Sequence, residues 1–93
     1  MRNGDIIHTK SSYNLDTGES VYNHYAILFK ISSIFTKIFI FTHNPRKGKN
    51  IDKSKLTMYN KNIKFDDTTK LDISNNVTVL KGNEEILGHY DLD

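Results

Sequence analysis

Residues 24–44, HYAILFKISSIFTKIFIFTHN, decide the fold of this chain. The β-branched and aromatic side chains of residues 25–31 and 34–41 predict two strands, and Ser32 and Ser33 between them predict a turn. The first strand is apolar nearly throughout, which is typical of a central strand. Three phenylalanines give the second strand a large share of the aromatic side chains available for burial. The two segments therefore predict a hairpin at the heart of the core.

Outward from this hairpin, short apolar runs alternate with polar segments and turn residues. The runs that predict further strands are residues 5–9, 56–59, 63–65, 71–73 and 77–80. Turns are predicted at residues 16–18 and 66–68. Residues 10–23 and 42–50 are polar and predict exposed loops. Residues 83–87 predict a single helical turn that Gly88 ends.

The length and composition predict a single domain that spans residues 1–93. Apolar residues make up 37% of the chain and charged residues 26%, enough for a core and for solubility. The chain has no cysteine, which excludes disulfides, thiolate metal sites and cysteine nucleophiles. The pattern predicts an all-β or mostly β domain.

The basic residues are unevenly distributed, although the net charge is only +2. Residues 46–64 carry seven basic side chains against the single acid Asp52, so this segment has a charge of +6. The basic side chains are Arg46, Lys47, Lys49, Lys53, Lys55, Lys61 and Lys64. A basic segment on an otherwise acidic body is typical of a surface that binds a phosphate backbone. The alternative is a solvated loop whose lysines keep an edge strand from aggregating.

Three residues at the ends of the predicted hairpin are candidates for catalysis. His24 precedes the first strand, and Thr42 and His43 follow the second, so antiparallel pairing brings them to the same edge of the sheet. An imidazole moves protons near neutral pH, and neighbouring cations stabilise charge that develops on phosphate. This set therefore predicts metal-independent RNA cleavage, with no metal and no cofactor. The alternative is that both histidines are ordinary half-buried residues at strand ends.

Several short motifs resemble the MazF/PemK/Kid family of toxin endoribonucleases. Arg2 to Ile7 (RNGDII) is similar to the opening motif of that family, and residues 38–42 are similar to its third strand, which ends in a catalytic Thr. Further similar passages are Gly18-Glu19-Ser20, residues 24–28, residues 77–80 and Ile86-Leu87-Gly88. The resemblance covers most of the chain in order, but each motif is short.

The resemblance implies a small SH3-like antiparallel β barrel or strongly bent sheet of roughly five to seven strands, with at most a short C-terminal helix, and the strand pattern permits this fold. It also implies single-stranded RNA as substrate, a cognate antitoxin and a homodimer. Thr42 falls on the catalytic Thr of the family, and His24 falls where the family has a catalytic Arg. An imidazole takes over acid or base chemistry but lacks the forked, permanently charged guanidinium. Only five residues follow Gly88 in this sequence, so the longer C-terminal helix that supports the family's dimer and antitoxin groove is not expected.

Two functions from different classes follow from these observations. The first is a metal-independent endoribonuclease toxin in which Thr42 and His24 act at the scissile phosphate and His43 is a candidate second proton carrier. In that hypothesis Arg46, Lys47 and Lys49 hold the RNA backbone. The second is a non-catalytic protein of the same fold, similar to the gyrase-poisoning toxin CcdB, such as a phage or mobile-element factor that inhibits a host enzyme or binds nucleic acid. An accessory structural domain is a third interpretation. With no signal peptide and no membrane span expected, the sequence predicts a cytoplasmic protein.

Overall fold

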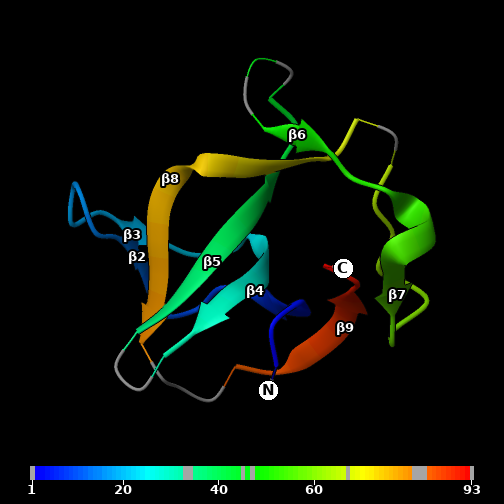
Figure 1. The fold of residues 1–93 in the computed structure, drawn as a ribbon, viewed down its shortest axis with the longest axis horizontal. Helices are drawn as coiled ribbons and strands as arrows, with labels where there is room; N and C mark the ends of the chain where they lie inside the picture. The colour runs from blue at the N-terminus through cyan, green and yellow to red at the C-terminus, as the bar shows by residue number, and fades with distance from the viewer. Residues whose placement is uncertain are drawn as a thin grey trace.

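The computed structural model describes residues 2–32, 35–44, 46, 48–66, 68–80 and 84–92, and these residues form a mostly β structure (Figure 1). Its strands are β1 (Asp5–His8), β2 (Ser12–Asn14), β3 (Ser20–Val21), β4 (Tyr25–Ile31), β5 (Phe35–Thr42), β6 (Lys49–Asn50), β7 (Leu56–Met58), β8 (Lys70–Leu80) and β9 (Ile86–Tyr90). A short 3-10 helix, η1 (Lys53–Lys55), precedes β7. The predicted fold class, a mostly β domain built on an antiparallel bent sheet, is confirmed.

The strands form one antiparallel sheet in the order β3-β2-β8-β5-β4-β1-β9-β7, with β6 paired to β8. Strands β4 and β5 pair with Ala26 opposite Ile40 and Ile27 opposite Phe39, so the predicted central hairpin is confirmed. Ser33 and Ile34, which belong to the predicted turn and to the start of its second strand, lie outside the described residues.

The long strand β8 turns a corner and bends the sheet, as Figure 1 shows. Its register with β5 shifts between Val77, which lies opposite Ile38, and Asp72, which lies opposite Ile40. Asp72 shapes this irregularity, because its carboxylate accepts hydrogen bonds from the backbone and hydroxyl of Ser74. Because of this bend, the C-terminal half of β8 pairs with β2. Its N-terminal half pairs with β6 and with the end of β5. Four residues of β8 between the two registers have no partner on β5, which is why the strand changes direction there.

The core lies on the two faces of β4 and β5. Alternate side chains of a strand point to opposite faces, so Ala26 and Leu28 pack in one cluster and Ile27 in another. The first cluster is completed by Ile7, Ile38, Val77 and Val79, and the second by Ile6, Phe41 and Met58. The apolar run of β4 is thus explained by burial on both faces.

Several sequence predictions of local structure are wrong. Residues 71–73 and 77–80 belong to a single strand, β8, and the described residues form a sheet of nine strands, more than predicted. Residues 63–65 form no strand, because their apolar side chains pack onto the second core cluster from a loop. The polar segments 10–23 and 42–50 contain the short strands β2, β3 and β6. Short polar strands at the margin of a sheet show no alternation of apolar and polar residues, so the sequence pattern does not predict them.

The predicted helical turn at residues 83–87 is also wrong. Ile86, Leu87 and Gly88 belong to strand β9, and Asn83 lies outside the described residues. Gly88 lies opposite Ile6 of β1 and Met58 of β7, and a Cβ atom there would come within 2.8 Å of the Met58 sulfur. The glycine therefore permits close packing of three strands and does not end a helix.

Candidate functional site

The start of β4 and the end of β5 form the sheet edge on which the sequence placed its catalytic candidates. The register pairs Ala26 with Ile40, and continuing it by two residues sets His24 opposite Thr42. His24 is tied to the end of β1, since its backbone N–H donates to Oγ1 of Thr9 at 3.0 Å. The side chain of His24 is exposed and makes no hydrogen bond to another described residue. His24 and Thr42 thus share an edge, and no hydrogen bond joins their side chains.

The hydroxyl of Thr42 stabilises the turn that follows β5. Its Oγ1 accepts a hydrogen bond from the backbone N–H of Asn44 at 3.1 Å, a local turn of a kind that Thr often makes. Because Oγ1 is an acceptor in this contact, its proton is available to a further acceptor. The turn directs the next residue, His43, across the end of the sheet toward residues 66–69.

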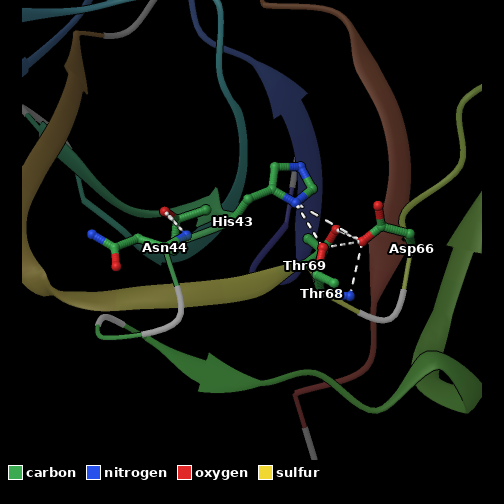
Figure 2. A network of polar contacts seen from close by, with 6 residues as sticks. His43, Asn44, Asp66, Thr68 and Thr69 are labelled. Carbon is green, nitrogen blue, oxygen red and sulfur yellow. Dashed lines mark hydrogen bonds and ion pairs between the residues drawn. The ribbon is translucent and has the colours of Figure 1, made fainter.

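His43 is held by residues that the sequence analysis did not connect with it. Its Nδ1 atom lies 3.2 Å from Oγ1 of Thr68 and 3.9 Å from Oδ1 of Asp66, and Figure 2 shows the three side chains gathered at the end of β5. The imidazole remains 70% exposed. The contact joins two loops 25 residues apart in the sequence.

The hydrogen bonds that Asp66 accepts favour the ionised form of its carboxylate. Its Oδ1 atom accepts from the Thr68 hydroxyl at 2.6 Å, from the Thr68 backbone N–H at 2.8 Å and from the Thr69 hydroxyl at 3.4 Å. The hydroxyl bond from Thr68 is the largest influence that lowers the pKa of Asp66 below 3.8, and the backbone bond and the charge of His43 act in the same direction. Asp66 is therefore an anion at neutral pH.

This network selects one tautomer of His43. The proton of the Thr68 hydroxyl is committed to Asp66, so the Thr68 oxygen acts as an acceptor toward His43. Nδ1 of His43 must then carry the hydrogen, and in the neutral ring Nε2 is left with its lone pair. A ring that is held at Nδ1 and open at Nε2 is suited to accept a proton from a bound molecule.

A pocket of about 420 Å³ opens beside His43. It is lined by Tyr25, His43, Lys64, Phe65, Asp66 and Thr69. The Phe65 ring stacks on Phe41 with centroids 4.5 Å apart and meets Tyr25 edge-on at 5.4 Å. These ring contacts anchor the loop that carries Asp66 to the second core cluster. The pocket thus combines aromatic surface, one cation, one anion and an imidazole.

The basic segment borders this pocket from one side. A second pocket of about 280 Å³, lined by Lys53, Asn50, Ile51, Asp66 and Thr69, lies on the other side of Asp66. The predicted backbone ligands Arg46 and Lys49 are exposed, and Lys47 lies outside the described residues. Strand β6 places Lys49 opposite Leu71 of β8. The positive charge therefore lies at the same end of the sheet as His43.

The sequence analysis missed Asp66, Thr68, Thr69 and Phe65 as members of the site. The pattern Asp-x-Thr predicted the turn correctly, because an Asp side chain caps the backbone N–H two residues later. No local signal could connect this turn with His43. In the described ranges, no three His, Asp or Glu side chains gather as a metal site requires. No helix among the described residues has the length and hydropathy of a membrane span.

Comparison of the sequence with models of known protein families finds no matching family, and neither the curated proteins nor the solved structures contain a match. The resemblance to the MazF/PemK/Kid family stays a prediction.

Proposed function

We propose that this chain is a cytoplasmic, metal-independent endoribonuclease that cleaves single-stranded RNA, with His43 as its principal proton carrier. The observation that supports this proposal is the orientation of the His43 ring by Thr68 and Asp66. A carboxylate that orients an imidazole and stabilises its protonated form is a recurring device in acid–base catalysis.

In the proposed reaction, Nε2 of His43 takes the proton of a ribose 2′-hydroxyl. The 2′-oxygen then forms a bond to phosphorus as the bond from phosphorus to the 5′-oxygen breaks. His24, at the same sheet edge, supplies a proton to the departing 5′-oxygen, and the products are a 2′,3′-cyclic phosphate and a 5′-hydroxyl. Thr42 donates its free hydroxyl proton to a phosphate oxygen, and Lys64 stabilises the negative charge that develops.

The pocket beside His43 favours a single-stranded substrate. A base that leaves the strand stacks on exposed parts of Tyr25 and Phe65, a contact that duplex bases cannot make. Arg46, Lys47 and Lys49 hold the neighbouring phosphates. Because phosphate contacts release counterions, binding should weaken steeply as salt rises.

The test is cleavage of a long single-stranded RNA by purified protein in excess EDTA, which inactivates contaminating metal nucleases. Wild type should give discrete fragments with cyclic phosphate ends, and His43→Gln should lower the rate by about 10²–10⁴-fold. His24→Gln and Thr42→Ala should also lower the rate. Thr57→Ala is the matched control for Thr42→Ala, because Thr57 is exposed on the remote strand β7. Intact RNA with wild type, or equal cleavage by wild type and His43→Gln, would refute the proposal.

A non-catalytic member of the same fold is the second candidate. The observation that favours it is that His24 makes no side-chain hydrogen bond to Thr42 or His43 in the described structure, together with an imidazole where the MazF/PemK/Kid family has Arg. Such a protein would bind RNA, or a host enzyme in the manner of CcdB, without cleaving. Salt-sensitive binding of RNA in EDTA, unchanged in His43→Gln and without product, would favour this function. A cognate antitoxin and a homodimer belong to the toxin proposal, and co-expression and light scattering test them.

A further inference from the structure

A second imidazole–carboxylate pair lies away from the His43 site, where β1 and β9 pair. Asp5 lies opposite His89 in the register, and Oδ1 of Asp5 is 3.0 Å from Nδ1 of His89. Asp5 is only 4% exposed. Its other oxygen, Oδ2, accepts the backbone N–H of Arg2 at 2.9 Å. The carboxylate is therefore buried and hydrogen-bonded through both oxygens.

The Asp5 carboxylate orients the His89 ring. A carboxylate only accepts, so Nδ1 of His89 donates to it and Nε2 is left for another partner. The ring rests against Gly4, since a Cβ atom built there would lie 2.7 Å from Cε1 of His89. The side chain is still 21% exposed. His89 is thus fixed on one side and accessible on the other.

Arg2 adds a forked cation beside this pair. Its Nε atom lies 3.6 Å from Oδ1 of Asp5, while the side chain is 69% exposed. Within the part of the chain that the structure describes, its terminal nitrogens make no hydrogen bond or ion pair. A guanidinium held in this way presents paired N–H donors, a geometry that fits a phosphate.

Arg2 and His89 line a pocket of about 720 Å³, with more volume than either pocket beside Asp66. Its other lining residues are Asn3, Phe29, Asp91 and Leu92. The Phe29 ring is 42% exposed and is supported from below by Phe39, with centroids 4.5 Å apart. Oδ1 of Asn3 accepts the backbone N–H of Ile31 at 3.2 Å, which leaves the amide N–H groups as donors.

We propose that this pocket is a nucleotide site that is independent of the RNA cleavage proposed above. The phosphate accepts hydrogen bonds from the guanidinium of Arg2 and from the Nε2–H of His89 in its imidazolium form, whose Nδ1–H donates to Asp5, and the base packs on the exposed ring of Phe29. The ligand has two sources, a free nucleoside monophosphate or the 5′-phosphorylated end of an RNA.

The test is an NMR titration of full-length wild-type protein in EDTA, in which the imidazole signals of the four histidines are followed separately. The probes are AMP, inorganic phosphate, adenosine, and a pentanucleotide with or without a 5′-phosphate. AMP should shift the His89 and Phe29 signals with saturation, and phosphate or adenosine alone should bind about tenfold more weakly. If the phosphorylated pentanucleotide binds more tightly than AMP, the natural ligand is the 5′-phosphorylated end of an RNA. If AMP binds more tightly, the natural ligand is a free nucleotide.

The variants separate a ligand site from a structural clamp. Arg2→Gln should weaken AMP binding by about tenfold, whereas Lys10→Gln, an exposed cation outside the pocket, should not change it. His89→Gln should lower affinity similarly, and the wild-type titration decides the question if that variant does not fold. His43→Gln should lose RNA cleavage and keep AMP binding, which distinguishes the two proposals. The absence of saturable shifts at His89 and Phe29 in wild type would refute the site.

Discussion

Phe65 connects the loop that carries Asp66 to the sheet, so its removal should affect stability and the candidate site together. Phe65→Ala removes the stacked contact with Phe41 and the edge contact with Tyr25. Each such ring pair contributes about 0.5–1.5 kcal/mol beyond burial, so the two contribute about 1–3 kcal/mol. Burial of most of the ring adds about 1–2 kcal/mol. The expected loss of unfolding free energy is therefore about 2–5 kcal/mol.

This loss is large but does not have to unfold the protein. A chain of 93 residues has a stability of about 5–14 kcal/mol, from about 0.05–0.15 kcal/mol per residue. Urea unfolding followed by circular dichroism measures the change, and RNA cleavage is assayed below the urea midpoint of the variant. Tyr59→Ala is the control, because Tyr59 is 58% exposed and its loss should cost no more than about 0.5 kcal/mol. A Phe65→Ala protein that matches wild type in stability would refute the anchoring role.

Three further substitutions test the electrostatics and the core. The pKa of Asp66 is lowered in the folded state by the Thr68 hydroxyl, so this carboxylate stabilises the fold above its unfolded pKa of 3.8, and the contribution is lost as pH falls through the lower folded pKa. Asp66→Asn should therefore reduce the acid-induced loss of stability below about pH 4, measured by urea midpoints across pH, and an unchanged profile would contradict the assigned cause. Ile27→Ala should cost about 2–5 kcal/mol because the side chain is fully buried, whereas Ile73→Ala, at a side chain that is 39% exposed, should cost about 1 kcal/mol or less in the same unfolding assay. Gly88→Ala should strongly lower the midpoint of thermal unfolding, because the new methyl group would collide with backbone and sulfur atoms of β7. An unchanged midpoint would show that β7 and β9 can move apart at little cost.

The central hairpin could be predicted because its signal is local. A long run of β-branched and aromatic side chains on both sides of Ser32 and Ser33 has one stable solution, a pair of strands buried on both faces. The same pairing explains why His24 and Thr42 share a sheet edge, since hairpin register follows from the turn. The absence of cysteine and the basic segment 46–64 are also read directly from the sequence.

The contacts that build the two candidate sites could not be predicted in this way. The pairing of His43 with Thr68 and that of Asp5 with His89 join residues 25 and 84 positions apart. Such contacts depend on how the corner in β8 and the strand order place distant segments, and no periodicity encodes that placement. The strand at Ile86–Tyr90 was mistaken for a helical turn because Gly88 looks like a helix end when its neighbours in β1 and β7 are unknown.

By itself, then, the sequence determined the β class, the central hairpin and the location of the positive charge, because burial and turn formation depend on neighbouring residues. Only the tertiary structure decided which imidazole is oriented by which hydroxyl or carboxylate. Hydrogen bonds of about 3 Å between residues far apart in the sequence require the sheet to be folded around its core before either partner is in place.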